Sequence, residues 1–311
     1  MTARSLALHE PLTATEIVEL AVLAEGLGYD RIWFGEVRGP DPFVCAAAVA
    51  MRTRRVELGT SIASYFARSP FSLAVSATSV ADLSGRTFRL GIGPGGKGLV
   101  ENIHQREFGK PLEAGLAAIQ AIRDGLGDGG PRSRVRWQRE VDVRVYLAAL
   151  GPKMRHAAYQ HADGFIAPFE TPEYVRAVDK ERQEVPSSAE HCVRLLVAVT
   201  DDVRPARERM RETIRFYLDS PHYRRHFAAQ GFASEVADYL AASARGERAG
   251  QLAAVSDALV DAMLVCGSAG HCAGRIAEYL DSGAGDLMVS PFSELGPAVV
   301  AATVTALAPN R

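Results

Sequence analysis

The stretch Arg86-Thr87-Phe88-Arg89-Leu90-Gly91-Ile92-Gly93-Pro94-Gly95-Gly96 is a short apolar strand that runs into a glycine-rich loop. Main chain without side chains, placed directly after a buried strand, lets a flat or phosphorylated ligand come close to the backbone. The loop formally matches the GxGxxG pattern, but Pro94 interrupts it and the next helix is expected to start only near Pro111. A dinucleotide fold needs a helix that opens directly on the glycines, so a pyridine-nucleotide dehydrogenase is the least favoured interpretation.

Outward from this stretch, apolar segments of strand length alternate with amphipathic segments of helical length. Thr13 and Glu16 have the spacing of a capping box, and Gly28 and Gly85 are typical helix stops. Strands are expected at residues 6–8, 31–35, 56–60, from 86 into the glycine loop, 141–147, 165–167, 192–199 and 286–289. Helices are expected at 14–27, 42–51, 70–83, 111–126, 152–162, from 172, from 269 and at 294–307.

Eight strand and helix pairs predict a (β/α)₈ (TIM) barrel, with residues 1–311 forming one domain. After the seventh strand the pattern breaks into charged, helical sequence, so a helical insertion is expected at about residues 201–263. An open, doubly wound α/β sheet is the structural alternative, because eight parallel strands alone do not exclude it.

Charge and composition restrict the class of partner. The 311 residues include 35 basic and 37 acidic side chains, a formal net charge of -2, which gives no electrostatic reason to expect nucleic acid or an anionic membrane. No apolar run reaches the roughly 18 residues of a membrane span, and the N-terminus resembles a strand rather than a signal peptide. We therefore expect a cytoplasmic protein that acts on a small molecule. The four cysteines are scattered, so neither a metal site nor a disulfide framework is expected.

In such a barrel the chemistry lies on the loops that follow the strands. His9 and Glu10 follow the first strand, Glu36 the second and Glu170 the sixth. After the fifth strand, Gly151-Pro152-Lys153 opens a helix. The free amides in the first turn of a helix bind anions in many proteins, and here Lys153 adds a positive charge. A plain strand-to-helix turn has the same residues, and this alternative stays open.

The segments 24–33, 83–93 and 162–164, which read AEGLGYDRIW, LSGRTFRLGIG and ADG, resemble the bacterial luciferase-like monooxygenase and reductase superfamily. The likeness spans essentially the whole chain, including Ser282-Gly283-Ala284-Gly285-Asp286. Within the superfamily, Asp41-Pro42-Phe43 and the pair of motifs Gly91-Ile92-Gly93-Pro94-Gly95 and Lys110-Pro111-Leu112 are most similar to the methylenetetrahydromethanopterin reductase branch. Enzymes of that branch use the deazaflavin coenzyme F420 rather than FMN.

The resemblance implies where a cofactor lies. It places the flavin-like ring across the carboxyl end of the barrel, against a non-prolyl cis peptide at Ser61-Ile62 or its neighbour. It also places the cofactor's phosphate by the loops after the fourth and fifth strands, here Gly93-Pro94-Gly95 and Ala149-Leu150-Gly151-Pro152. The branch has an acidic residue directly after Gly-Pro-Gly, where this chain has Gly96, so an archaeal pterin substrate is not expected.

The resemblance further implies hydride transfer from reduced F420 to a C=N or C=C bond of a small organic substrate. The protein must then supply a fixed stacking distance and one proton donor. Glu36 and His9 are the leading catalytic candidates, with Glu10 and Glu170 behind them. The alternatives are an FMN-dependent monooxygenase of the same fold and a flavin-binding relative without turnover. The superfamily commonly forms dimers, so a homodimer is expected. The charged and aromatic insertion is expected to be a lid, a dimer surface or an ordinary helix with one solvated and one packed face.

Overall fold

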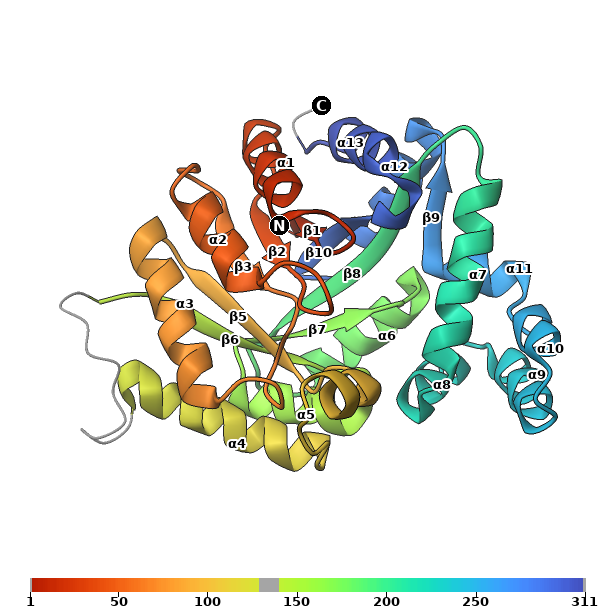
Figure 1. Cartoon of the computed structure of the whole chain (residues 1–311), viewed down its shortest axis with the longest axis horizontal. Coiled ribbons are helices and arrows are strands. Elements are labelled where there is room, and N and C mark those ends of the chain that lie inside the picture. The colour runs from red at the N-terminus through yellow and green to blue at the C-terminus, as the bar shows by residue number, and fades with distance from the viewer. Residues whose placement is uncertain (1, 129–139, 310–311) are drawn as a thin grey trace.

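Eight parallel strands close into a barrel that helices surround (Figure 1). The structure is a computed structural model and describes residues 2–128 and 140–309. The barrel strands are β1 (Ala3–Leu8), β2 (Arg31–Phe34), β3 (Glu57–Thr60), β5 (Phe88–Gly93), β6 (Val143–Ala148), β7 (Gly164–Pro168), β8 (Glu190–Val199) and β10 (Asp286–Pro291).

The first and last barrel strands are hydrogen-bonded neighbours. Strand β10 pairs in parallel with β1, where Val289 lies opposite Leu6, and with β8, where Val289 lies opposite Leu195. The ring of pairings therefore has no free edge. This closure confirms the TIM barrel and excludes the open doubly wound sheet.

Helices alternate with the strands, and most of them begin at a proline, whose fixed φ and missing N–H suit the first turn. The outer helices are α1 (Ala14–Gly26), α2 (Pro42–Ala50), α3 (Pro70–Ser84), α4 (Pro111–Arg123), α5 (Pro152–His161), α6 (Pro172–Gln183), α12 (Ala269–Leu280) and α13 (Pro297–Ala306). The helical insertion is confirmed as α7 (Arg204–Leu218), α8 (Pro221–Ala228), α9 (Ala233–Ala244), α10 (Arg248–Ala253) and α11 (Asp257–Met263). Thr13 and Glu16 form the expected capping box.

Three details differ from the expected elements. Strand β9 (Leu264–Gly267) pairs with the second half of β8, and the sequence conceals it because it follows α11 with no turn residue between them. A two-residue strand, β4 (Ala63–Ser64), pairs with β5. Gly296, at φ 93°, separates α13 from a short 3-10 turn, η3 (Ser293–Leu295), where one continuous helix was expected. Part of the loop expected after residue 126 lies outside the described residues.

Alternate residues of each strand face the barrel axis, so the interior is built in layers. The middle layer is the apolar cluster of Ala7, Trp33, Tyr146, Ile166, Cys192 and Met288. Two residues earlier along the strands lies a polar layer, whose members are Ser5, Arg31, Glu57, Arg89, Glu190 and Asp286. Two residues later, at the carboxyl ends, lies the layer that we call the mouth, whose members are His9, Gly35, Ser61, Gly93, Ala148, Pro168, Arg194 and Ser290.

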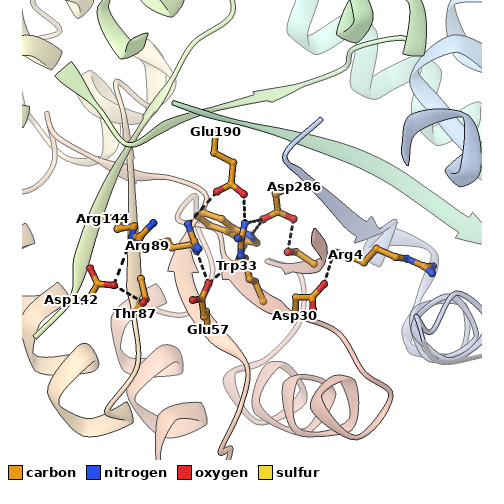
Figure 2. Close-up of polar contacts among 12 residues, drawn as sticks. Arg4, Asp30, Trp33, Glu57, Thr87, Arg89, Asp142, Arg144, Glu190 and Asp286 are labelled. Carbon is orange, nitrogen blue, oxygen red and sulfur yellow. Dashed lines mark hydrogen bonds and ion pairs between the residues drawn. The ribbon is translucent and has the colours of Figure 1, made fainter. Parts of the chain in front are cut away.

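The polar layer is organised around Asp286, whose side chain is fully buried. Asp286 accepts hydrogen bonds from Ser5 Oγ at 2.5 Å and, through Oδ2, from Arg31 Nη1 and Trp33 Nε1, both at 3.0 Å. Glu57 and Glu190 both contact Arg89 (Figure 2). Both also contact Arg31, so they link the two arginines. Opposed charges from five strands therefore satisfy one another at the amino end of the barrel.

Candidate active site

The mouth has two chemically different halves. Along β2, β3, β5 and β6 the residues of this layer are small: Gly35 and Ser61 come directly after β2 and β3, and Gly93 and Ala148 end β5 and β6. The residues of β1, β8 and β10 are polar: His9 comes directly after β1, and Arg194 and Ser290 lie in β8 and β10. The first half lets a planar group approach the backbone, and the second presents hydrogen-bonding side chains.

The two loops expected to hold a phosphate lie side by side. Strands β5 and β6 pair with Ile92 opposite Leu147, which brings their carboxyl ends together. A Cβ atom placed on Gly93 would lie 2.9 Å from Ala148 Cβ, so only glycine permits this contact. Gly95 has a φ of 71°, which favours glycine, and Ser64 Oγ donates a 3.1 Å hydrogen bond to the Pro94 carbonyl.

Beyond these contacts the main chain of both loops faces open space. A Cβ atom on Gly96 or Gly151 would meet no heavy atom within 4 Å. Gly151 is the N-cap of α5, no side chain caps that helix, and Lys153 in its first turn is exposed. Ala149 is buried and its amide donates to the Ile166 carbonyl, so its side chain takes no part in the open surface. The site therefore fits a phosphate that binds to backbone amides.

The peptide bond between Ser61 and Ile62 is cis, as the family resemblance predicts. The Ile62 side chain lies against Gly93, where a Cβ atom would approach Ile62 Cγ1 to 2.8 Å. Ile62 is half-buried, and so is Ser61. These two residues thus form one wall of the small-residue half of the mouth, beside the loops that face open space.

Glu36 lies at the mouth but is held by neighbours from the next loop. Its Oε2 accepts a 2.9 Å hydrogen bond from the Ser64 amide, and its Oε1 accepts one of 2.7 Å from Arg68 Nε. Arg68 also pairs with Asp41 and lies over the Phe43 ring. In this arrangement Glu36 orders the loop after β3, and its oxygens act as acceptors.

His9 is a neutral imidazole with both nitrogens engaged. Arg194 can only donate, so its 2.6 Å contact makes His9 Nε2 an acceptor, and Nδ1 then carries the proton that it donates to the Glu10 carbonyl at 2.8 Å. Desolvation and the nearby charge of Arg194 lower the pKa of His9 to about 3. The ring therefore stays uncharged at neutral pH.

The other two acidic candidates are Glu10, next to His9 in the chain, and Glu170 after β7. Glu10 Oε2 is buried and has no hydrogen-bond partner. Glu170 is sealed beneath the helices, where Oε2 contacts His191 Nε2 at 2.8 Å. Burial raises the pKa of Glu170, but His191, with smaller effects of His226 and Arg155, outweighs burial, so the pKa is lowered overall. Successive residues of β8 alternate in direction, and His191 faces away from the barrel axis. Glu170 is paired with His191 and therefore also lies away from the axis.

A cavity lies at the amino end of the barrel, opposite the mouth. This cavity of about 330 Å³ is lined by arginines and acids that include Arg31, Arg89 and Glu190. The two arginines are already paired with Glu57 and Glu190, so the charges that line it are satisfied. We therefore place the candidate site at the mouth, where barrel enzymes carry their chemistry.

Sequence reasoning missed Arg194, Ser290 and Arg68. Arg194 is the single charge in the apolar run of residues 192–199, a signal that was visible in the sequence. Ser290 and Arg68 carry no comparable signal, because their partners His9 and Glu36 lie far away along the chain.

Replacing His9 by glutamine should weaken the pH dependence of folding. The folded pKa of His9 lies below the unfolded value near 6.5, so its neutral form adds stability above that value and loses it as the pH falls toward 3. As the pH falls from about 7.5 to about 5, protonation of His9 should lower the free energy of unfolding of the wild type by about 2 kcal/mol. The variant should not show this loss. Urea unfolding of both proteins at both pH values measures the difference, and an equal loss in both would contradict the neutral assignment.

The fold defines a parallel (β/α)₈ barrel whose mouth combines small residues with a cluster of polar side chains. A family model described as "Luciferase-like monooxygenase" matches residues 1–286, and the chain belongs to this family. It is 26% identical to 5,10-methylenetetrahydromethanopterin reductase of Methanolobus tindarius, over 91% of each chain.

Solved structures share the barrel. The coenzyme F420 dependent tetrahydromethanopterin reductase from Methanopyrus kandleri has a TM-score of 0.76 at 17% identity, covering 99% of this chain and 98% of that one. The oxygenating constituent of 3,6-diketocamphane monooxygenase from Pseudomonas putida, in complex with FMN, has a TM-score of 0.66 at 18% identity, covering 100% and 97%. The chain is similar in sequence to a reductase and belongs to a family named after monooxygenases, and both findings support its classification as an oxidoreductase.

Across residues 2–128 and 140–309, no helix is long and apolar enough to cross a membrane. In the same part of the chain, no three histidine, cysteine or acidic side chains gather as metal ligands.

Proposed function

We propose that the protein is an F420-dependent oxidoreductase that transfers hydride from the reduced deazaflavin to a C=N or C=C bond of a small organic molecule. The observation that carries this proposal is the small-residue half of the mouth, which adjoins two loops of open main chain. The sequence likeness to methylenetetrahydromethanopterin reductase supports a reductase rather than an oxygenase.

In this proposal Ser61 and Ile62 support the cofactor ring, and the loops at 93–95 and 149–152 hold its phosphate. The bound deazaflavin supplies the hydride. The backbone amides at the start of α5 and the exposed Lys153 favour an anion there through the helix dipole and charge. The apolar middle layer beneath the mouth keeps water from entering along the barrel axis.

Glu36 and His9 remain the proposed proton donors, and the structure defines what each must do. Glu36 must be released from Arg68 and Ser64 before it can carry a proton. His9 must take a proton at Nε2, which the charge of Arg194 opposes. Glu36 is therefore the favoured donor. Replacing Glu36 by glutamine should reduce turnover by 10²-fold or more, the usual range for a lost general acid, while His9→Gln reduces it less.

Cofactor titration tests the proposal. The purified protein, freed of cofactor, is titrated with F420 and separately with FMN, and protein fluorescence reports binding. We expect F420 to bind at least tenfold more tightly than FMN. The protein is then loaded with reduced F420 and mixed anaerobically with a panel of imines and activated alkenes. Hydride transfer to a substrate should restore the absorbance of oxidised deazaflavin. Tighter binding of FMN, with oxygen consumption, would instead support the monooxygenase.

An FMN-dependent monooxygenase is the second candidate. The family description and the FMN complex of the Pseudomonas putida relative favour it. The same mouth and loops serve both cofactors, so the cofactor titration decides between them. We further propose a cytoplasmic location. The near-neutral charge supports our proposal that neither nucleic acid nor an anionic membrane is a partner.

We also propose that two copies of the chain pair through α2 and α3. Val44, Met51 and Phe71 are 65%, 64% and 52% exposed there, and Asp82 is the one charged residue in the two helices. A twofold contact sets a face against itself, and a face with few charges avoids bringing like charges together. The double variant Val44→Glu, Met51→Glu should be monomeric by light scattering, whereas Leu240→Glu on the insertion should remain dimeric. A monomeric wild type would contradict the proposal.

A further inference from the structure

Arg194 is a cation that faces the barrel axis at the mouth. It lies in β8, two residues after Cys192 of the apolar middle layer, and the alternation of the strand turns both side chains inward. Its contacts with His9 and with Ser290 of β10 confirm this direction. Arg194 is half-buried, so it remains open to the mouth.

No carboxylate in the described part of the chain lies within 4.0 Å of the Arg194 guanidinium. Its Nη2 contacts His9 Nε2 at 2.6 Å and its Nε contacts Ser290 Oγ at 3.3 Å. Both partners are neutral, because desolvation and Arg194 itself hold His9 uncharged. By contrast, Arg31 and Arg89 in the polar layer each contact two or more carboxylates. The charge of Arg194 is therefore uncompensated.

The Nη1 and Nη2 end of the guanidinium keeps two N–H donors that can bind an oxyanion. His9 and Ser290 occupy the Nε and Nη2 edge, while Nη1 makes no hydrogen bond with the described residues. An arginine fork donates two parallel hydrogen bonds to a carboxylate or phosphate. His9 and Ser290 fix the orientation of the side chain, which reduces the entropy lost when an anion binds.

Aromatic side chains lie beyond the neighbouring strand. Pro168 of β7 lies opposite Arg194 of β8 in the register of the two strands, and Phe169 comes directly after it. In agreement, Arg194 acts against the rise that burial causes in the pKa of the Tyr223 phenol. Tyr217 packs on Tyr223 with ring centroids 4.5 Å apart, and Phe169 after β7 packs on both. The surroundings of Arg194 thus combine one open cation with an aromatic wall.

We propose that Arg194 binds an oxyanion group, a carboxylate or a phosphate, on the organic substrate, and that the apolar part of that substrate lies against Tyr217 and Tyr223. That the bound anion is the substrate rests on the proposed function, whereas the binding of an anion by Arg194 does not. It assigns the small-residue half of the mouth to the cofactor and the polar half to the substrate. An anionic, partly aromatic molecule is the class of substrate that fits.

Calorimetric titration of the full-length protein with matched acids and amides tests the assignment. The probes are benzoate with benzamide, phenylacetate with phenylacetamide, and phenyl phosphate, each with and without F420. We expect at least one acid to bind tenfold or more tightly than its neutral partner, and Arg194→Gln to remove that preference. Arg194→Lys should keep part of it, since it retains the charge but not the fork. Arg144→Gln, a matched loss of charge near the amino end of the barrel, should change nothing.

Two results would overturn the proposal. One is that no acid binds better than its amide to the wild type, a comparison that does not depend on the folding of any variant. The other is that Arg194→Gln weakens F420 binding tenfold and leaves the acids unaffected, which would assign Arg194 to the cofactor. Failure of F420 to bind, with the acid preference intact, would refute the proposed cofactor but support the anion site.

Discussion

Replacing Asp286 by alanine should lower the free energy of unfolding by about 3–5 kcal/mol, because it removes one partner from a buried charge network. The change leaves the Arg31 guanidinium short of a carboxylate and the Trp33 N–H and Ser5 hydroxyl without an acceptor. The polar layer joins β10 to β1 and β2, so the loss falls on the strands that close the barrel. Urea unfolding followed by far-UV circular dichroism measures it.

Asp142→Ala is the matched control. Asp142 is exposed and contacts Thr87 and Arg144 at the surface, so its loss should cost less than about 0.5 kcal/mol. Equal stability losses in the two variants would show that the polar layer does not stabilise the closed barrel. The variant Asp286→Asn keeps the size of the side chain, and its loss of stability should lie between those of Asp286→Ala and Asp142→Ala.

Replacing Gly151 by valine should weaken F420 binding tenfold or more without lowering the stability of the protein. Gly151 has an extended φ of -111°, and a side chain there meets no atom within 4 Å, so the fold accepts it. The new methyl groups would occupy the space that we assign to the phosphate. Fluorescence titration gives the affinity, and thermal unfolding checks the fold.

Gly274→Val is the control for this substitution. Gly274 lies exposed in α12, also with no atom within 4 Å of its Cβ position, and α12 forms neither phosphate loop. Its F420 affinity should equal that of the wild type. An unaltered affinity in Gly151→Val as well would remove the loop after β6 from the cofactor site.

Local patterns predicted the barrel because strand length, helix periodicity, capping residues and helix-opening prolines repeat along the chain. They failed at β9, where the strand continues directly from α11 without Gly or Pro to separate them. The motif that ends at Asp286 was recognised as a family likeness, but its part in the polar layer depends on partners more than 250 residues away. Closure of a barrel joins the two ends of the sequence, and no local pattern shows such contacts.

For the candidate site, sequence reasoning located loops better than side chains. The positions of the loops follow from strand order, so the loops at 93–95 and 149–152 were correctly placed side by side. The cis bond at Ser61-Ile62 was expected from the family likeness and is present. The directions of Glu36 and Glu170 were not predictable, since Arg68 and His191 hold them through tertiary contacts. The roles of Glu36 and His9 stay predictions.

The central claim is that open main chain after β5 and β6 holds the phosphate of a deazaflavin. Its most direct test compares the affinity of the wild type for F420 with its affinity for the same deazaflavin without its phosphate and everything beyond it. We predict that F420 binds at least a hundredfold more tightly, and that Gly151→Val removes most of this difference. Equal affinities of the wild type for the two molecules would contradict the claim.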